Sequence, residues 1–291
     1  MAERTIETNN GARLCTEPFG DPADPPILLV MGVGASMLWW DESFCRLLAE
    51  GGLYVIRYDH RDTGRSVTYP PGQPGYTSSD LVADATAVLD AYRLPAAHVV
   101  GVSAGGALAQ LLALDFPDRV LSLVLISTSP ALPSQRKLPP PTNEFMRFVG
   151  TTQIDRSDPA SAIEYFVAYS RMLAGGERPF DEAAMRELVR RDVERARDFA
   201  AAQNHELLAE GEQPRRPLSA IEVPTLVIHG SGDPMFPTEH GRVLADAIPN
   251  AQLRILERAG HGIDPSDRET IAQAILEHST RSRSSRFDRL G

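Results

Sequence analysis

The chain has 291 residues, 42% of them hydrophobic, which is enough for one large core with an insertion. Its formal net charge of -10 argues against binding to nucleic acid, and no apolar run is long enough to span a membrane. The N-terminus does not resemble a secretion signal, and the two cysteines, Cys15 and Cys45, have no metal-ligand spacing. We therefore expect a cytoplasmic protein with no membrane or nucleic-acid partner.

The first 130 residues alternate short apolar strands with amphipathic helices. Such alternation predicts a mostly parallel sheet that is covered by helices on both faces. The expected elements are a hairpin with an Asn10-Gly11 turn, strands at 27–31, 53–58 and 120–126 with another that begins at residue 97, and helices at about 41–50 and 79–92.

The most informative motif is Gly101-Val-Ser103-Ala-Gly105, which lies between an apolar strand and a helix-forming segment. A strand, a sharp turn and a helix around a serine form a nucleophile elbow, in which the hydroxyl is exposed above the sheet. The two glycines avoid side chains where the strand and the helix nearly touch. A structural tight turn is the alternative, but the flanking elements favour Ser103 as a catalytic nucleophile.

Two loops downstream offer the other groups that such a serine needs. Asp233 follows the expected strand at 223–228, and His261 follows the expected strand at 252–256. The carboxyl ends of parallel strands open on one crevice, so both side chains can reach Ser103. A carboxylate holds one imidazole nitrogen while the other takes the serine proton. The alternative acids are Glu257 and Asp264.

The remaining histidines are weaker candidates for the catalytic base. His229 ends a strand and is expected to pack or hydrogen-bond locally, and His98 lies inside the strand before the serine. His60 precedes the serine, which is the wrong order for this arrangement. Three further histidines fall in helical stretches and are expected to be solvated: His205, His240 and His278.

The oxyanion of an acyl-transfer intermediate needs two backbone N–H donors. Ala104, directly after the serine, is expected to supply one of them. Val33 is expected to supply the other, because Gly32 lets the backbone turn the next N–H inward. An ordinary glycine turn after the third strand is the alternative.

After residue 126 the alternation stops, because five prolines between 130 and 141 break the chain. From about 142 to 213 the pattern is helical, and strands resume at Pro224. We expect a helical cap at 131–217, inserted between the sixth and seventh strands of a core formed by 1–130 and 218–280. The last residues, 281–291, hold four arginines and are expected to form a mobile basic tail.

Aromatic residues and methionines of the cap, with a tryptophan pair after the third strand, are expected to form an apolar substrate pocket. Helical spacing allows the alternative that they only pack the cap onto the core, and the tryptophans could equally anchor the following helix. The expected substrate-binding residues are Trp39, Trp40, Phe145, Tyr165, Tyr169 and Met172. In the segment 59–66, Asp59, Arg61, Arg65 and Ser66 are expected to fix their own loop by hydrogen bonds; binding of a substrate carboxylate is the alternative.

Together these residues resemble the α/β-hydrolase superfamily, over nearly all of residues 5–279. Segments 58–66 (YDHRDTGRS), 19–25 and 29–32 look like the aclacinomycin methylesterase group, and segments 35–37 and 40–46 look like the serine-dependent macrolide esterases. The resemblance implies an α/β-hydrolase fold with an eight-stranded sheet, and the same catalytic and oxyanion residues. The chain departs from these groups in Ser103-Ala-Gly-Gly, where a Met or Leu often follows the serine.

These observations predict a serine hydrolase that cleaves an ester or lactone of a bulky hydrophobic, polyketide- or macrolide-like molecule, without a metal or cofactor. The alternatives are a methyl esterase for an anthracycline-type product, a hydrolase of carbon–carbon bonds, and a non-catalytic ligand-binding protein of the same fold.

Overall fold

The computed structural model describes residues 2–134, 136–209 and 216–287. Its centre is an eight-stranded sheet in the order β1-β2-β4-β3-β5-β6-β7-β8. β2 pairs antiparallel with β1 and β4, and all other neighbours are parallel. The expected eight-stranded, mostly parallel sheet is thus confirmed. The strands are β1 (Arg4–Glu7), β2 (Arg13–Phe19), β3 (Pro26–Val30), β4 (Tyr54–Tyr58), β5 (Ala97–Val102), β6 (Val120–Ile126), β7 (Thr225–Gly230) and β8 (Gln252–Leu256).

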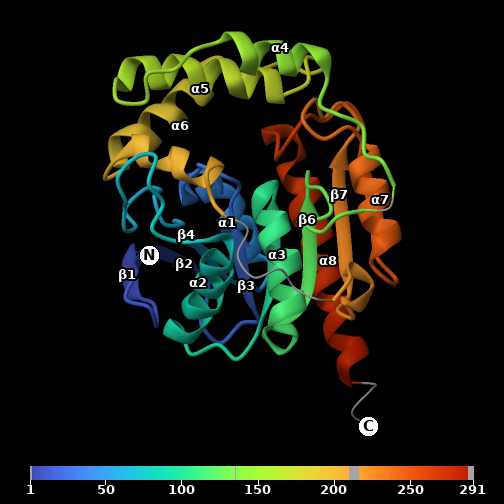
Figure 1. The fold of residues 1–291 in the computed structure, drawn as a ribbon. Helices are drawn as coiled ribbons and strands as arrows, with labels where there is room; N and C mark the ends of the chain where they lie inside the picture. The colour runs from blue at the N-terminus through green and yellow to red at the C-terminus, as the bar shows by residue number, and fades with distance from the viewer. Residues whose placement is uncertain (1, 135, 210–215, 288–291) are drawn as a thin grey trace.

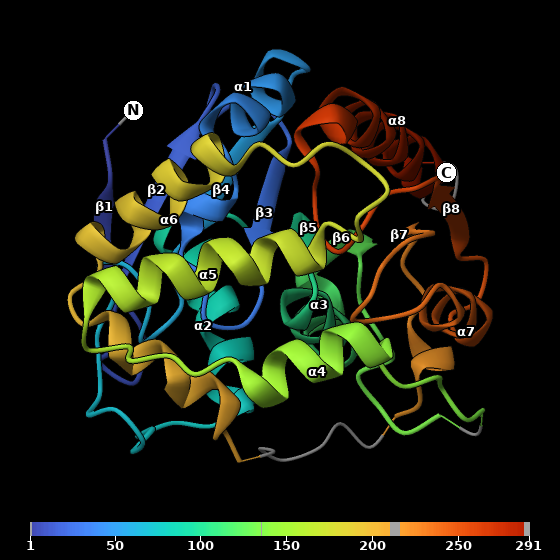
Figure 2. The same ribbon diagram turned by 90° about the horizontal axis from the view of Figure 1, so that it is seen from above.

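Helices cover both faces of this sheet (Figures 1 and 2). One face packs on α2 (Ser78–Ala91), α3 (Ala104–Asp115) and α7 (Glu239–Ala247), and the other on α1 (Glu42–Glu50) and α8 (Arg268–Phe287). The strands supply both cores because successive side chains point to opposite faces. In β3, for example, Leu28 lies in the first core and its neighbours Ile27 and Leu29 lie in the second.

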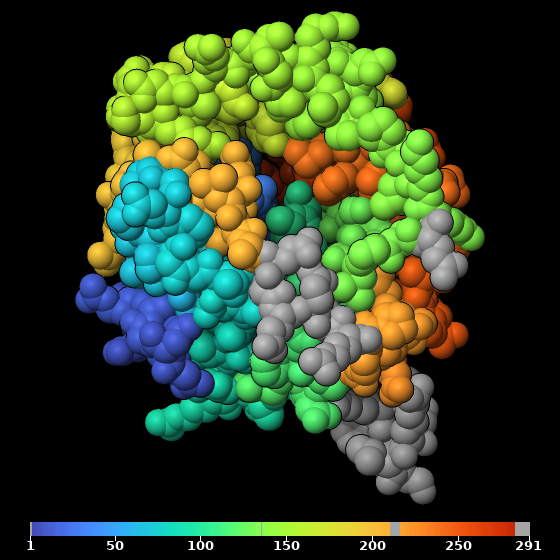
Figure 3. All heavy atoms as spheres, in the orientation of Figure 1, coloured from blue at the N-terminus to red at the C-terminus, as the bar shows by residue number. Residues whose placement is uncertain are grey.

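Between β6 and β7 the chain leaves the sheet and forms a helical layer, which we call the cap. It contains α4 (Asn143–Thr151), α5 (Pro159–Leu173), α6 (Glu182–Arg195) and the 3-10 helix η3 (Phe199–Glu206). Figure 1 shows α4 and α5 above the carboxyl ends of the central strands, and Figure 3 shows the surface hollowed beneath them. Residue 135 and residues 210–215 of the expected insertion lie outside the described residues.

The C-terminal boundary differs from the expectation from sequence. α8 continues to Phe287, so residues 281–287 of the expected tail are helical. Within this stretch the Ser282 hydroxyl donates to the carbonyl of His278 at 2.7 Å, a local bond that composition alone does not reveal. Residues 288–291 lie outside the described residues.

In the described part of the chain no helix is both long enough and apolar enough to cross a bilayer.

Candidate active site

The candidate nucleophile lies at the turn between β5 and α3. Ser103 adopts φ 54° and ψ -124°, a left-handed conformation that is rare for a residue with a side chain. Two of its hydrogen bonds come from outside the elbow: its N–H donates to Ile126 O at 3.0 Å, and its carbonyl accepts from Thr128 Oγ1 at 2.7 Å. The elbow therefore keeps a strained backbone in place through contacts with the neighbouring strand β6 and the loop after it.

The glycines around Ser103 are required by close backbone packing. A Cβ on Gly101 would lie 2.3 Å from the carbonyl oxygen of Gly105. A Cβ on Gly105 would lie 2.2 Å from the carbonyl oxygen of Val30, at the end of β3. A Cβ on Gly32 would lie 3.3 Å from Cβ of Ser103, so the loop after β3 runs directly beside the serine.

Asp233 and His261 lie in contact, as the chain order predicted. Nδ1 of His261 is 2.8 Å from Oδ2 of Asp233, while Oδ1 of Asp233 accepts the backbone N–H groups of Met235 and Phe236 at 2.9 and 2.8 Å. Burial of Asp233 pushes its pKa upward, but the charge and hydrogen bond of His261 outweigh burial. The pKa of Asp233 is therefore lower than its ordinary 3.8, and the carboxylate stays ionised beside the imidazole.

The loop that carries His261 is held from two sides. Its backbone N–H donates to Leu173 O at the end of α5, at 2.7 Å, and the N–H of Gly262 donates to Ser127 Oγ at 3.0 Å. Among the hydrogen bonds of the described residues none involves Nε2 of His261 or joins that ring to Ser103. The structure thus describes no partner for this nitrogen, and hydrogen bonds between a catalytic base and its nucleophile commonly tighten only when substrate binds.

No described hydrogen bond joins the carboxylate of either alternative acid to the imidazole of His261. Asp264 instead accepts from Ser266, at the start of a short 3-10 turn, and the carbonyl of Glu257 accepts from the guanidinium of Arg178. His229 donates from Nε2 to Phe236 O at 2.7 Å, so its expected local role is confirmed.

The turn after β3 presents a free N–H beside the serine. Ala35 N–H donates to Gly32 O at 3.5 Å, and Gly34 has φ 70°, which glycine adopts without strain. Among the described hydrogen bonds, none uses the N–H of Val33 or that of Ala104 at the first position of α3. Both backbone donors that the sequence named for an oxyanion are thus without a described hydrogen-bond partner.

A family model described as the alpha/beta hydrolase fold matches residues 25–263. The chain belongs to this family. The rhodomycin D methylesterase of Streptomyces sp. (strain C5) is 36% identical over 294 residues, with 96% of this chain and 98% of that protein covered. The rhodomycin D methylesterase of Streptomyces peucetius has the same identity and coverage. A solved esterase from Exiguobacterium antarcticum has a TM-score of 0.76 at 22% identity, and covers 96% of this chain and 100% of that one.

In this alpha/beta hydrolase the cap carries an aromatic cluster along α4 and α5. Tyr165 and Tyr169 stack with ring centroids 6.0 Å apart, and Phe145, with 5% of its surface exposed, packs 5.8 Å from Tyr169. Burial raises the pKa of Tyr169 above its ordinary 10.0. Met172 follows one turn later and is half-buried. The cluster also contains Phe148 and Phe166, which belong to the aromatic residues of the cap that the sequence singled out.

The two tryptophans have different surroundings, and Trp40 follows the alternative from sequence, that of an anchor for the following helix. Trp40 has 1% of its surface exposed and stacks on Phe44 in the core under α1, so the expectation that it lines the pocket is wrong. Trp39 packs against the cap and donates from Nε1 to Asp192 of α6 at 2.7 Å. Adjacent side chains of a turn point in different directions, and only packing decides which one faces a site.

The three histidines that were expected to be solvated instead form hydrogen bonds within the protein. His240 contacts Ser129 Oγ and Pro139 O, both at 2.9 Å, and His278 contacts Pro224 O at 3.2 Å. His205 bonds through both ring nitrogens, to Gly34 and to Arg61. Each partner comes from a distant segment, which explains why helical spacing led to the wrong expectation.

The segment Asp59–Ser66 holds its own loop, as expected. Asp59 accepts the N–H of Arg65 at 2.9 Å, and its carbonyl accepts from Ser66 Oγ at 2.7 Å, while Arg61 pairs with Asp84 of α2. Arg195, at the end of α6, also pairs with Asp59 at 2.7 Å, a contact that no local pattern predicts. This buried ion pair fastens the cap to the core.

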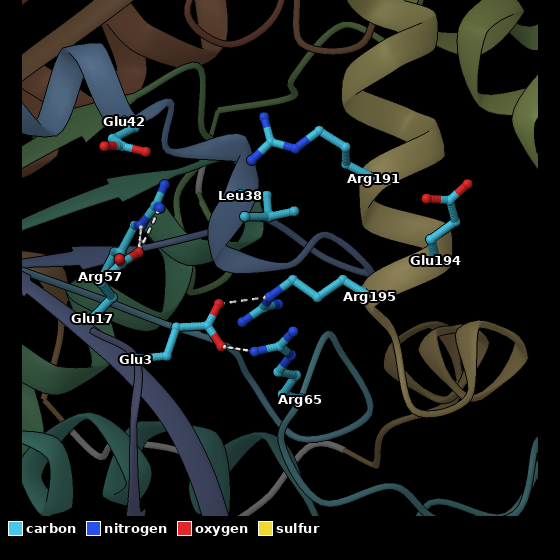
Figure 4. A pocket seen from close by; sticks show the side chains of 9 residues that line it. All are labelled: Glu3, Glu17, Leu38, Glu42, Arg57, Arg65, Arg191, Glu194 and Arg195. Carbon is cyan, nitrogen blue, oxygen red and sulfur yellow. Dashed lines mark hydrogen bonds and ion pairs between the residues drawn. The ribbon is translucent and has the colours of Figure 1, made fainter. Parts of the chain in front are cut away.

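A cavity of about 390 Å³ lies away from the serine, between the first strands and α6 (Figure 4). Its charged walls are largely paired: Glu3 binds both Arg65 and Arg195, at 2.6 and 2.9 Å, and Arg57 binds Glu17 at 2.6 Å. The Glu3–Arg195 pair joins α6 to the residue before β1, and the Arg57–Glu17 pair joins β4 to β2. Within the residues that the structure describes, no group of three or more His, Cys, Asp and Glu side chains is placed to hold a metal ion.

Proposed function

We propose that the chain is a serine hydrolase of carboxylic esters, with Ser103 as nucleophile, His261 as base and Asp233 as the acid that orients the base. One observation carries the proposal: a carboxylate 2.8 Å from His261 lies on the same edge of the sheet as a serine held in a left-handed elbow. Binding alone requires neither the strained serine nor the two unpaired N–H donors beside it.

The mechanism follows from the groups in place. Nε2 of His261 takes the Ser103 proton as the hydroxyl oxygen attacks the ester carbonyl, and Asp233 stabilises the imidazolium that forms. The N–H groups of Val33 and Ala104 bind the oxyanion of the tetrahedral intermediate. His261 then protonates the departing alkoxide, and water repeats the sequence on the acyl-enzyme.

For the substrate we propose an ester of a bulky, hydrophobic polyketide, cleaved at a methyl ester. Two features support this choice: the named relatives at 36% identity are methylesterases, and the cap carries stacked aromatic rings on α5. Such rings suit a large apolar molecule better than a sugar or a charged metabolite. Cleavage of a macrolide lactone, which belonged to the first expectation from sequence, uses the same chemistry and is the second candidate here. The free, buried thiols of Cys15 and Cys45 support a reducing, cytoplasmic location.

Ser103→Ala tests the nucleophile. Hydrolysis of p-nitrophenyl butyrate by the purified variant is expected to fall by at least about 10⁴-fold, because no other hydroxyl replaces the attacking one. The mutant's circular-dichroism spectrum and melting curve serve as the folding control. A variant that keeps wild-type turnover would refute the assignment.

The substrate class is tested by products. The wild-type protein, incubated with an anthracycline methyl ester and with a macrolide, is expected to release methanol from the first and to leave the second intact. A macrolide product that is heavier by one water would instead establish lactone cleavage and reject the methyl-ester proposal.

A further inference from the structure

His205 of the cap joins two loops of the core. Its Nδ1 accepts the backbone N–H of Gly34 at 3.0 Å, and its Nε2 lies 2.7 Å from the carbonyl oxygen of Arg61. A nitrogen that accepts a hydrogen bond carries no proton, so the ring is neutral with its proton on Nε2. Burial lowers the pKa of His205, which favours this neutral form.

The turn that His205 contacts has little support of its own. Among the described backbone–backbone hydrogen bonds, residues 32–35 share one, from Ala35 to Gly32, and it is long at 3.5 Å. The α-carbon of Val33 joins two peptide groups. The first contains the N–H of Val33, and the second contains the N–H of Gly34. Anchoring the second group through the N–H of Gly34 therefore restricts the rotation that would turn the Val33 N–H away from Ser103.

We propose that His205 is a positioning residue, which holds the 32–35 turn so that the N–H of Val33 faces the oxyanion. The proposal rests on the proposed function, since only an acyl-transfer reaction forms this oxyanion. It also gives the cap a second role, because the cap then fixes one of the two oxyanion donors besides covering the site.

The neighbouring residue provides a matched control. Asn204 lies in the same 3-10 helix and is fully buried. It donates from Nδ2 to Asp62 at 2.9 Å and accepts the N–H of Gly72 at 2.7 Å, and it makes no described hydrogen bond to residues 32–35. Asn204→Leu therefore removes a buried link between the cap and the core without touching the oxyanion turn.

The first experiment compares His205→Leu, His205→Gln and Asn204→Leu. The assays are steady-state kinetics with p-nitrophenyl butyrate and inhibition by an alkyl trifluoromethyl ketone, which forms a tetrahedral adduct with the serine. Loss of one oxyanion donor costs roughly 10²–10³ in rate, so a misdirected donor in His205→Leu should lower kcat by about 30- to 100-fold. The inhibition constant of the ketone should rise by a similar factor, with KM nearly unchanged.

The other two variants separate positioning from general stability. Glutamine offers an oxygen acceptor to Gly34 and an N–H donor to Arg61, so His205→Gln should recover most of the lost kcat. Asn204→Leu should destabilise the protein while the inhibition constant of the ketone stays near the wild-type value. Equal losses in His205→Leu and Asn204→Leu, or an unchanged ketone constant in His205→Leu, would overturn the proposal.

A second experiment needs neither catalysis nor a variant. In ¹⁵N NMR spectra of the wild-type protein near pH 7, His205 should appear as the neutral Nε2–H tautomer, and the amide hydrogen of Gly34 should be protected from exchange. A charged ring, the opposite tautomer or a rapidly exchanging Gly34 amide would reject the proposed contact. The NMR measurement tests the contact between His205 and Gly34, whereas Ser103→Ala tests the nucleophile. The two proposals can therefore be rejected independently of each other.

Discussion

The substitution Asp233→Asn should inactivate the protein while leaving its fold in place. Oδ1 of Asp233 accepts two backbone N–H groups, from Met235 and Phe236. An asparagine must keep its carbonyl oxygen at that position, so its NH₂ group replaces Oδ2 and faces Nδ1 of His261. An amide donor there forces the imidazole proton onto Nε2, the nitrogen that must accept the proton of Ser103.

The wrong tautomer should cost about 10⁴-fold in kcat, as in other serine hydrolases where the acid is replaced by its amide. Stability should change little, because both backbone donors keep their acceptor and the volume of the side chain is conserved. The large kinetic effect and the small stability effect together identify a group that acts through the imidazole.

The assay is kcat and KM for p-nitrophenyl butyrate, with urea unfolding as the measure of stability. Asp264→Asn and Glu257→Gln are matched controls, since they make the same chemical change at the two acids that sequence left open, and neither contacts His261 through a described hydrogen bond. Both should retain kcat within about threefold, as surface substitutions usually do. If Asp233→Asn keeps more than a tenth of wild-type kcat, or if either control loses as much activity, the assignment of the acid is wrong.

Gly105→Ala should lower the free energy of unfolding by at least about 2 kcal/mol and reduce kcat, because its Cβ would lie 2.2 Å from the carbonyl oxygen of Val30. Gly150→Ala in α4, where a Cβ meets nothing within 4 Å, should be neutral or stabilising by up to about 1 kcal/mol in the same urea titration. Burial raises the pKa of Asp192 from an ordinary 3.8 to about 6, so its ionisation destabilises the fold increasingly as pH rises through that window, by up to roughly 3 kcal/mol. Asp192→Asn, which keeps an acceptor for Trp39, should therefore be more stable than wild type at pH 8 and should lose this advantage near pH 4; an equal difference at both pH values would contradict this reasoning.

Local sequence was sufficient for the sheet and for the order of the candidate catalytic groups. Successive side chains of a strand point to opposite faces of the sheet, so an apolar strand contributes to both cores. Ile27 lies in one core and its neighbour Leu28 lies in the other. The elbow around Ser103 is likewise predictable from neighbouring residues, since glycines, strand and helix are adjacent in the chain. Asp233 and His261 were predicted because both follow strands of one parallel sheet, and their 2.8 Å contact is a direct consequence of that topology.

The sequence by itself therefore determined the features that depend on the spacing of apolar residues and on chain order. These are the strands, the helices, the elbow and the loops that follow the strands. Only the tertiary structure decided which side chains of the cap and of the loop after β3 face the site. Trp40 lies in the core, and His205 bonds to Gly34 across a sequence separation of 171 residues. Burial and hydrogen bonding of such groups depend on partners from distant segments, and local spacing holds no information about which segments will meet.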